Sequence, residues 1–448
     1  MNPFYCGKFE DLCKPVDKDI NKKNIVKMAT PNQSVVVSEV VDYTRTYINK
    51  QPDFTGGHLE TVIDDNMSNA ICIKKMHIED WKKILTIREV QMLKYFKGNF
   101  AVTQIVKGRQ CIYDNEYSYI LLEKLNYNLV QFIFKKMKDR SDYIFWQFMT
   151  MMNIAHALSK LHDNKIIHRD INFFNLYMRN KYDVAIGDLM FAIDENKNYD
   201  SIGYNSKILE ILDKIITYPA PEIGYAEFTF KSDIYSLGVV YYFLSIPDFI
   251  KDDKFKKEFK MSGTIKDCMD TSAISIKKIA FCVFTRPLIQ ELLSNSQEER
   301  PTTHELILKI NGTIECFLFH MFKENWGHEE FIDPLLVSEC EKFNTALEYF
   351  TEVKDMPTID GLQNFLSDFK KSLDKNYNYN QPHALELIKN NAIFFNALPD
   401  SGESILGSPI YKYISSKTED AKKHNEVKPK NKCFSRLCSL FKSKKLVI

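Results

Sequence analysis

Residues 165–176 read KIIHRDINFFNL, and this short stretch decides how the rest of the chain is interpreted. It carries a carboxylate at Asp170 and an amide at Asn175, and a second carboxylate follows at Asp188 in GDLMF. Magnesium prefers such hard oxygen ligands and keeps several waters beside them. Phosphoryl transfer needs metal ligands of this kind, together with one carboxylate that orients the acceptor hydroxyl. The spacing therefore predicts Asn175 and Asp188 as metal ligands and Asp170 as the orienting carboxylate.

Five further motifs accompany this stretch in a fixed order. ICIKKM begins at Ile71, IREVQMLKYF at Ile87, YPAPE at Tyr218, KSDIYSLG at Lys231 and ERPTTHEL at Glu299. With the HRD stretch and GDLMF they make seven matches, and over about residues 40–313 the chain resembles a eukaryotic-type protein kinase. Seven motifs in the family's order are far more specific than a single HRD triplet, which recurs by chance.

The resemblance implies a role for each matching residue. Lys74 stands where the family has the lysine that holds the phosphates of ATP, and Glu89 stands where it has that lysine's partner. The competing interpretation makes Asp170 a helix cap and Lys74 with Glu89 a solvated surface pair. The catalytic residues implied are Asp170, Lys74, Glu89 and Asn172; the ATP-binding residues are Gly56, Gly57, Lys74, Glu123 and Leu125; and the ligands of Mg²⁺, or of Mn²⁺ in its place, are Asn175 and Asp188.

Other matching residues have structural roles in the family. The resemblance implies that Asp233 braces the catalytic loop, and that Glu222 and Arg300 form a buried ion pair in the C-lobe. Together with Ala220 and Pro221 they build the half of the lobe that binds a protein substrate. A small-molecule kinase of the choline or aminoglycoside type is therefore disfavoured.

The Gly-rich loop that covers the phosphates in this family is reduced here. Only Gly56 and Gly57 remain in KQPDFTGGHL, and Pro52 and Phe54 stand where the family prefers glycine. Glycine lets the backbone approach a ligand closely, so its loss predicts weak ATP binding.

The catalytic loop also departs from the family pattern. The Lys-Pro pair of the family is Asn172-Phe173 here, and Ile215 replaces the threonine that buttresses that lysine. Asparagine donates hydrogen bonds but brings no charge, so stabilisation of the transferring phosphoryl group should fall by about 2–4 kcal/mol, or about 10²–10³ in rate. Lys74 and two metal ions would remain, which predicts a loop that works slowly.

The segment after Asp188 raises two further expectations. Leu189 and Met190 replace the family's Phe-Gly, which predicts a segment that swings less easily, with ordinary core packing as the alternative. Arg169 could pair with a phosphate in the activation segment, or residues 206–216 could pack as a helix without phosphorylation. The candidate acceptors in that segment are Tyr199, Ser201, Tyr204 and Ser206.

Residue patterns predict a two-lobed α+β body, with one small sheet and one helix followed by a larger helical part. The resemblance implies that this is a two-lobed protein-kinase-like fold, with a small β-rich N-lobe that contains one helix and a larger helical C-lobe. Strands are expected at 34–49, 58–63, 70–76 and 117–125, and a helix at 79–96. Three amphipathic helices are expected at 329–354, 359–373 and 383–398. The predicted parts are a leader (1–33), a kinase domain (34–313), a helical extension (314–400) that pads the C-lobe or binds a partner, and a flexible basic tail (401–448).

The basic tail is the one strongly charged region. Residues 422–448 hold nine Lys and Arg against one Glu, whereas the whole chain has a net charge of +1, so we expect no nucleic-acid binding. An apolar face with basic flanks predicts contact of residues 430–448 with an anionic membrane, each basic residue contributing about 1 kcal/mol. Palmitoylation of Cys433 and Cys438 would add a second anchor. A solvated charge run is the alternative.

Three features that the sequence lacks bear on the cellular compartment of the protein. It has no signal-peptide pattern at its start and no run of apolar residues long enough to span a bilayer. Its ten cysteines include no CxxC pair, which favours reduced thiols and a cytoplasmic protein.

Two function hypotheses follow from these patterns. The first is an active protein kinase. The loop lacks the arginine that tyrosine kinases place nearby, and a Ser/Thr acceptor is preferred mainly because it is the commoner class, with Tyr as the alternative. The second is a weak or dead pseudokinase that serves as a scaffold, supported by the reduced Gly-rich loop and by Asn172. The divergent, Asn/Lys/Ile/Phe-rich chain is similar to effector kinases that intracellular bacteria inject into host cells; large DNA viruses and protists are alternative sources.

Overall fold

The described residues of the computed structural model are 14–15, 35–37, 57–64, 71–77, 80–105, 111–113, 117–125, 127–136, 143–195, 218–223, 228–245, 285–322, 358–377 and 382–396. All of them belong to the compact unit Met1–Ala397. The other unit, Leu398–Ile448, contains the predicted tail and lies outside the described residues. Among the helices that are described, none is long and apolar enough to cross a membrane.

Six strands form one sheet in the order β1-β5-β6-β4-β3-β2. The long central strands pair antiparallel, and their β-branched and aromatic residues favour extended backbone. They are β3 (Gly57–Asp64), β4 (Ile71–His77) and β6 (Tyr117–Glu123); β1 (Lys14–Pro15), β2 (Val35–Val37) and β5 (Cys111–Tyr113) are shorter. The strands predicted at 58–63, 70–76 and 117–125 are confirmed, and that at 34–49 is described only as β2.

The strand β5, which lies between β1 and β6, carries a cysteine that departs from the prediction. Cys111 in β5 is disulfide-bonded, so the expectation that the cysteines are reduced thiols is wrong at this position.

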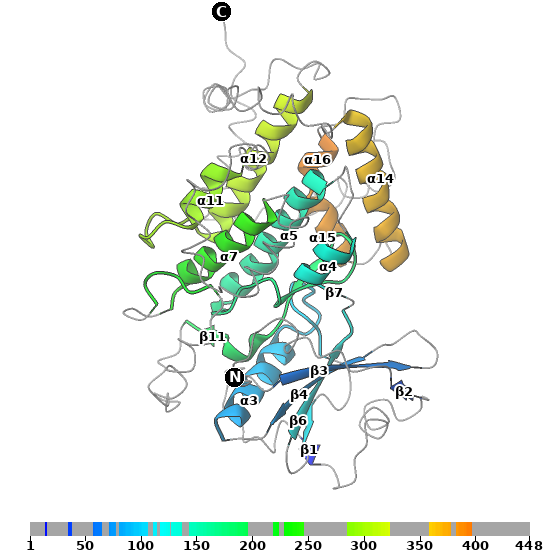
Figure 1. The fold of residues 1–448 in the computed structure, drawn as a ribbon, viewed down its shortest axis with the longest axis vertical. Helices are drawn as coiled ribbons and strands as arrows, with labels where there is room; N and C mark the ends of the chain where they lie inside the picture. Colours follow the sequence, from blue (N-terminus) through cyan, green and yellow to red (C-terminus); the bar gives the residue numbers. More distant parts are fainter. Residues whose placement is uncertain are drawn as a thin grey trace, which may run out of the picture. The chain divides into compact units, whose positions relative to one another are not determined.

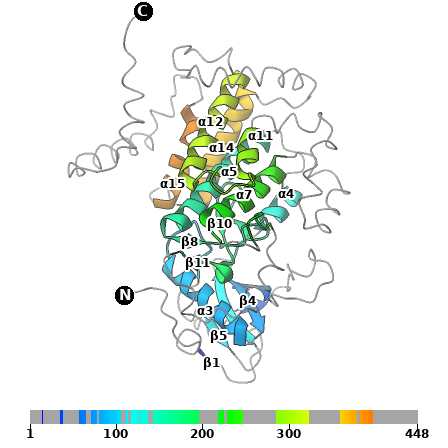
Figure 2. The same cartoon turned by 90° about the vertical axis from the view of Figure 1, so that its left-hand side faces the viewer.

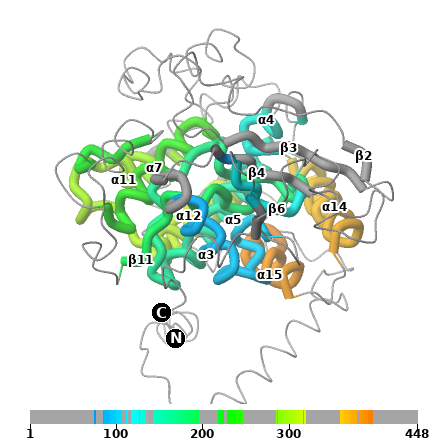
Figure 3. The backbone as a smooth tube through the Cα atoms, turned by 90° about the horizontal axis from the view of Figure 1, so that it is seen from below, coloured from blue at the N-terminus to red at the C-terminus, as the bar shows by residue number. Residues whose placement is uncertain are grey.

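One helix packs on the sheet, as predicted. α3 (Asp80–Tyr95) contacts β4 and β6, and Figure 3 shows it beside β6. Val90, Leu93 and the following Phe96 recur at helical spacing and are at most 2% exposed. This buried stripe fixes the rotation of α3 about its axis, and Glu89 therefore faces inward beside Val90.

The larger part of the fold is helical (Figures 1 and 2). Its central helix is α5 (Tyr143–Asp163), in which 17 of 21 residues are buried. A helix that is apolar on nearly every side belongs in the interior, and α5 contacts α12 on one side and α15 on another. The surrounding helices are α4 (Leu129–Lys136), α7 (Phe230–Leu244), α11 (Arg286–Leu292) and α12 (Thr303–Phe322).

The C-terminal helices pack against α5. α14 (Ile359–Asn376) confirms the helix predicted at 359–373, and its Phe365 ring lies 5.7 Å from that of Phe145 in α5. The helix predicted at 383–398 is two helices, α15 (Pro382–Asn390) and α16 (Ala392–Asn396). They separate at Asn391, whose side chain donates to Asn153 at 2.9 Å and to the carbonyl of Leu387 at 2.8 Å.

Other expectations lie outside the described residues or stay predictions. The helix predicted at 329–354 and the activation segment from 196 to 217 are not described. α12 continues across the predicted domain boundary at residue 313, and the four-part division of the chain stays a prediction.

Candidate active site

Three charged side chains meet where β4, α3 and the residue after Gly187 come together. Nζ of Lys74 lies 2.8 and 3.0 Å from the two carboxylate oxygens of Glu89, and 2.8 Å from Oδ1 of Asp188. Lys74 is 6% and Glu89 is 1% exposed, so they do not form a solvated surface pair. The structure thus brings together three residues that are far apart in the sequence, and their roles toward ATP and metal stay predictions.

The charges of this trio are unbalanced, because one ammonium lies between two carboxylates. Burial lowers the pKa of Lys74, but Asp188 and Glu89 outweigh burial and raise that pKa above its ordinary value. Burial raises the pKa of Glu89, Lys74 opposes the shift and Asp188 adds to it, which leaves a pKa of about 7. Lys74 therefore stays charged, and the excess negative charge of the trio suits a bound cation.

The catalytic loop lies between β8 (Ile166–Ile167) and β9 (Leu176–Met178), so Asp170 is not a helix cap. Each carboxylate oxygen of Asp170 accepts a hydrogen bond from an amide: Oδ1 from Nδ2 of Asn172 and Oδ2 from Nδ2 of Asn175, both at 2.8 Å. Asn172 also accepts, through Oδ1, from the backbone N–H of Phe174 at 2.8 Å. The Asn172 side chain thus does two things: it binds the Asp170 carboxylate, and it closes the loop by binding the backbone N–H of Phe174. Asparagine side chains commonly bind nearby backbone groups in turns.

The Asp233 carboxylate holds the backbone of this loop through two hydrogen bonds. Its Oδ2 accepts from the backbone N–H of His168 at 2.7 Å, and its Oδ1 accepts from that of Arg169 at 2.8 Å. Arg169 has φ of 71°, in the left-handed region that costs non-glycine residues energy, and these hydrogen bonds offset that cost. Thr229 caps the N-terminus of α7 and places Asp233 in its first turn. The predicted brace is therefore present in the geometry.

The segment that carries Asp188 is tightly packed. Its backbone N–H at Gly187 donates to the carbonyl of Asn175 at 2.8 Å, and a Cβ at Gly187 would lie 2.6 Å from the Tyr177 ring. No side chain fits there, which explains the glycine. Asp188 has a left-handed backbone, with φ of 58°. Leu189 and Met190 follow in the short 3₁₀ helix η1 (Leu189–Phe191) and are buried, as expected for core packing.

The predicted nucleotide-binding residues are described only in part. Gly56 lies outside the described residues with Pro52 and Phe54, and Gly57 begins β3. Glu123 ends β6, with Leu125 two residues later. The Glu123 carboxylate accepts from the Arg179 guanidinium at 2.8 and 3.3 Å. Its side chain is thus engaged within the protein, and the contact of Glu123 with nucleotide stays a prediction.

A second buried ion pair joins Glu222 and Arg300, as predicted. Two parallel hydrogen bonds of 2.8 Å connect the guanidinium and the carboxylate, and Ser232 donates to the same carboxylate at 2.9 Å. Burial opposes the charged carboxylate, but the hydrogen bond from Arg300 leads the effects that lower the pKa of Glu222 below its ordinary value. This pair is closed by its own partners and has a structural role.

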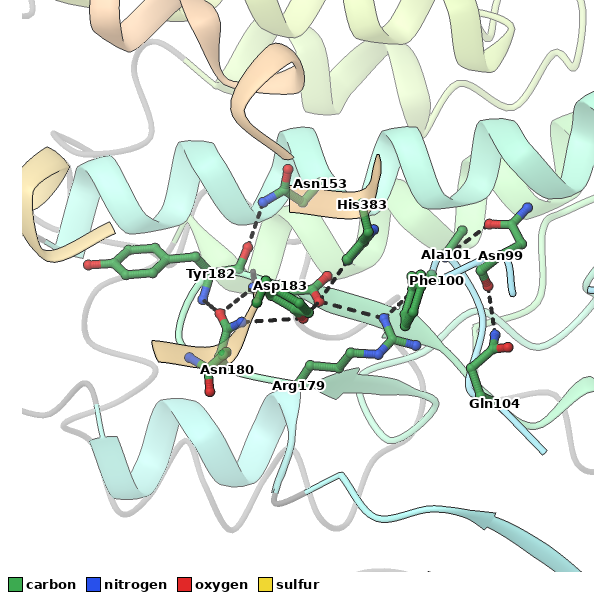
Figure 4. A network of polar contacts seen from close by, with 12 residues as sticks. Asn99, Phe100, Ala101, Gln104, Asn153, Arg179, Asn180, Tyr182, Asp183 and His383 are labelled. Atoms are coloured by element: carbon green, nitrogen blue, oxygen red, sulfur yellow. Dashed lines mark hydrogen bonds and ion pairs between the residues drawn. The ribbon is translucent and has the colours of Figure 1, made fainter. Parts of the chain in front are cut away.

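A polar network was missed by sequence reasoning. It is shown in Figure 4 and surrounds Arg179 and Asp183, which lie between β9 and β10 (Val184–Ile186). The network reaches Glu123 on one side and His383 of α15 on the other. The signal in the sequence is the opposite charges four residues apart in RNKYD, residues 179–183.

The predicted phosphate partner, Arg169, is engaged within the described residues. Its Nε donates to the carbonyl of Phe191 at 2.6 Å, and its guanidinium lies 5.4 Å from the centre of the Phe228 ring. The candidate acceptors Tyr199, Ser201, Tyr204 and Ser206 lie outside the described residues. Pairing of Arg169 with a phosphate there stays a prediction.

Comparisons with known proteins agree with this geometry. Residues 55–309 match the model of the protein kinase domain. The chain is 28% identical over 268 residues to a probable serine/threonine-protein kinase of Dictyostelium discoideum, covering 57% of this chain and 29% of that protein. It is 26% identical over 250 residues to serine/threonine-protein kinase polo of Drosophila melanogaster, covering 56% of this chain and 40% of that protein.

A yeast relative is matched over a longer stretch. The cell cycle serine/threonine-protein kinase CDC5/MSD2 of Saccharomyces cerevisiae is 26% identical over 327 residues, covering 68% of this chain and 42% of that protein. The chain thus spans less than half the length of these relatives. Because the family model covers more than half of the chain, the chain belongs to the protein kinase domain family.

Proposed function

We propose that this protein is an active kinase that transfers the γ-phosphoryl group of ATP to a Ser or Thr hydroxyl of a protein. One observation carries the proposal: Lys74 contacts both Glu89 and Asp188, while Asp170 is held by two amides. These are the cation and the carboxylates that phosphoryl transfer requires. The Ser/Thr kinases among the relatives favour the same acceptor class.

The donor atoms fit a magnesium ion with ATP. Nδ2 of Asn175 is used on Asp170, and Oδ1 of Asn175 accepts no hydrogen bond from the described residues. Asp188 uses Oδ1 on Lys74, and within the described part of the chain Oδ2 accepts none. An amide oxygen and a carboxylate oxygen are hard ligands that Mg²⁺, or Mn²⁺, accepts. When bound, the metal would neutralise charge on the phosphates.

The protein's own groups divide the remaining work. The Lys74 ammonium, kept charged by its carboxylate partners, would hold phosphate oxygens. The amides of Asn172 and Asn175 hold the Asp170 carboxylate in one orientation, where it can accept a hydrogen bond from the acceptor hydroxyl. Asn172 supplies no charge, so we expect a slow enzyme.

Incorporation of radiolabelled phosphate into a generic protein substrate tests the activity. The chain is compared with Asp170→Ala and Lys74→Met, and with Lys160→Met as a matched control, because Lys160 lies on α5 and is partly exposed. The proposal expects incorporation by the wild type and the control alone. Equal incorporation by all four proteins would overturn it.

A nucleotide-binding scaffold is the second candidate, supported by the loss of glycine at Pro52 and Phe54. A scaffold that binds Mg-ATP would be stabilised by it without turnover. Thermal unfolding with and without Mg-ATP, run beside the activity assay, separates the two candidates. A raised melting temperature with no phosphate transfer would favour the scaffold.

The tail carries a separate proposal about location. We propose a cytoplasmic effector acting on host proteins, with peripheral attachment to anionic membranes through residues 430–448. The basic residues Lys432, Arg436 and Lys442 flank the apolar residues of that stretch. Deletion of 430–448 should release the protein from vesicles that contain phosphatidylserine. The double variant Cys433→Ser with Cys438→Ser should be released from membranes only in cells that palmitoylate the wild-type protein. Unchanged partitioning of the deletion would overturn the membrane proposal.

A further inference from the structure

The hairpin formed by β9 and β10 has two differently used ends. At one end Asn175 precedes β9 and Asp188 follows β10 by two residues, so this end carries both candidate metal ligands. At the other end the connection of residues 179–183 carries Arg179 and Asp183. Three residue pairs, from Leu176 opposite Ile186 to Met178 opposite Val184, join the two ends. The two ends therefore belong to one short hairpin.

Arg179 holds the chain where β6 ends at Glu123. Its guanidinium donates to both carboxylate oxygens of Glu123, to the carbonyl of Val102 at 2.8 Å and to the carbonyl of Phe100. The Arg179 side chain is 7% exposed. A planar guanidinium with several donors suits such a set of acceptors, and lysine cannot replace it.

Glu123 is fixed further by the neighbouring segment. Its carboxylate accepts from the backbone N–H of Gln104 at 2.7 Å, and its own backbone N–H donates to the carbonyl of Gln104 at 2.8 Å. The Gln104 side chain donates to the carbonyls of Asn99 and Val102 at 2.7 and 2.8 Å. Removal of Arg179 would leave the Glu123 carboxylate without its cation and loosen this segment.

Asp183 connects the same guanidinium to the C-terminal helices. Its Oδ2 lies 3.7 Å from Nη1 of Arg179 and 2.9 Å from Nε2 of His383, and it also accepts from the hydroxyl of Tyr377. Asp183 is 1% exposed. The His383 ring stacks on Phe100 at 4.6 Å, and the same Phe100 ring lies 5.2 Å from the Arg179 guanidinium (Figure 4). Tyr377 follows α14 and His383 lies in α15, so both helices reach this one carboxylate.

The charges explain why the contacts depend on one another. One buried cation, Arg179, is shared by two carboxylates, Glu123 and Asp183, and burial of these charges is favourable only while each is paired. Burial lowers the pKa of Arg179, but Asp183 and Glu123 raise it overall. Loss of the Tyr377 and His383 contacts would draw the guanidinium toward Asp183 and away from Glu123.

We propose that Arg179 and Asp183 are positioning residues for the nucleotide site, through which the C-terminal helices α14 and α15 hold the chain segment of Glu123 and Leu125 in place. This inference rests on the proposed function, because that segment is expected to bind ATP. It assigns the extension a role beyond padding of the C-lobe. The helices act on ATP binding, and the transfer step itself depends on Asp170.

The test compares conservative variants of the network with a matched surface contact. Arg179→Gln removes the cation, and Tyr377→Phe with His383→Phe removes the two donors from the extension while ring packing is kept. The control is Lys160→Ala, which breaks the 2.8 Å bridge from α5 to Glu386 in α15, where both side chains are more than 40% exposed. The control loses a contact of the same helix without touching Arg179.

We expect KM for ATP to rise about tenfold in Arg179→Gln and about threefold in the double variant, with kcat changed less than about twofold. Lys160→Ala should change neither constant. Measurements below the melting temperature of each variant separate this effect from unfolding. Unchanged KM for ATP in both network variants, or the same change in the control, would overturn the inference.

Hydrogen exchange gives a readout that needs no activity. Amide exchange in peptides covering residues 101–105 and 117–125 should become faster in Arg179→Gln and in the double variant, but not in Lys160→Ala. Faster exchange in a protein that transfers no phosphate would support the positioning role and count against the proposed function. Phosphate transfer with unchanged exchange and unchanged KM would do the reverse.

Discussion

Two of the buried ion-pair sites among the described residues are built in opposite ways. In the Glu222–Arg300 site one cation binds one carboxylate through two hydrogen bonds of 2.8 Å, and the Ser232 hydroxyl donates a further hydrogen bond to that carboxylate. In the trio one ammonium, that of Lys74, serves both Glu89 and Asp188. The first site is electrically closed and the second has one negative charge too many.

This difference separates structure from function. A closed, bidentate pair needs nothing more, and breaking it leaves a buried charge unpaired. In an unbalanced trio the charged form of a carboxylate is less favourable, since burial and Asp188 raise the pKa of Glu89 to about 7. Such a site has capacity for a further cation, and a metal ion bound there would in turn hold phosphate groups, as phosphoryl transfer requires.

The largest expected effect comes from removing the cation of the unbalanced site. Lys74→Met should lower kcat/KM for ATP by at least about 10³, or about 4 kcal/mol, because phosphate binding loses its ammonium. Glu89 would then take up a proton, so we expect a small change in melting temperature. Steady-state kinetics and thermal unfolding measure the two effects. A Lys74→Met variant with a much lower melting temperature and unchanged activity would reverse the roles assigned to the two sites.

The matching change in the closed site should act on stability. Arg300→Leu leaves Glu222 as an unpaired buried carboxylate and should lower the free energy of unfolding by about 3–5 kcal/mol. Protein that is still folded should keep its KM for ATP. Denaturant unfolding measures the loss, and Lys309→Leu is the control, because its bridge to Glu291 is partly exposed. Equal losses in both variants would contradict the argument from burial.

The third change sharpens the comparison at Asp170, a carboxylate held by amides. Asn172→Ala removes the 2.8 Å hydrogen bond to Asp170 and the acceptor used by the Phe174 N–H. A hydrogen bond to a charged group contributes about 1.5–3 kcal/mol, so kcat should fall by about ten- to a hundredfold. Single-turnover measurements isolate the transfer step. An unchanged kcat would show that Asn172 only closes the loop.

The sequence predicted much of this site because its parts are local. The loop around Asp170, the strand of Lys74, the helix of Glu89 and the first turn of the helix with Asp233 are each specified by short segments whose periodicity and capping are visible in the sequence. Their order then sufficed to identify the family.

The missed features depend on contacts across the chain. The carboxylate of Asp183 and its partner His383 are 200 residues apart, and neither belongs to a motif. The break between α15 and α16 at Asn391 likewise depends on Asn153, a residue 238 positions away. Periodicity predicts one amphipathic helix there, because it does not register a buried hydrogen bond to another helix.

The smallest effect should be the most diagnostic, since the two sites respond to pH with opposite signs. The folded-state pKa of Glu89 is raised from 4.5 to about 7, so its contribution to stability is full below pH 4.5 and is lost as pH rises toward 7. The pKa of Glu222 is lowered, so its contribution is present above 4.5 and is lost as pH falls through the folded-state value.

Thermal unfolding between pH 4.5 and 7 should therefore distinguish the two carboxylates. As pH rises through this window, Glu89→Gln should gain stability relative to the wild type by at most about 1.4 kcal/mol per pH unit. Glu222→Gln should stay less stable than the wild type by a constant amount across this window, and should approach the wild type only below pH 4.5. Parallel curves for the two variants would mean that both sites are closed ion pairs, and the distinction between a structural and a functional site would no longer rest on charge.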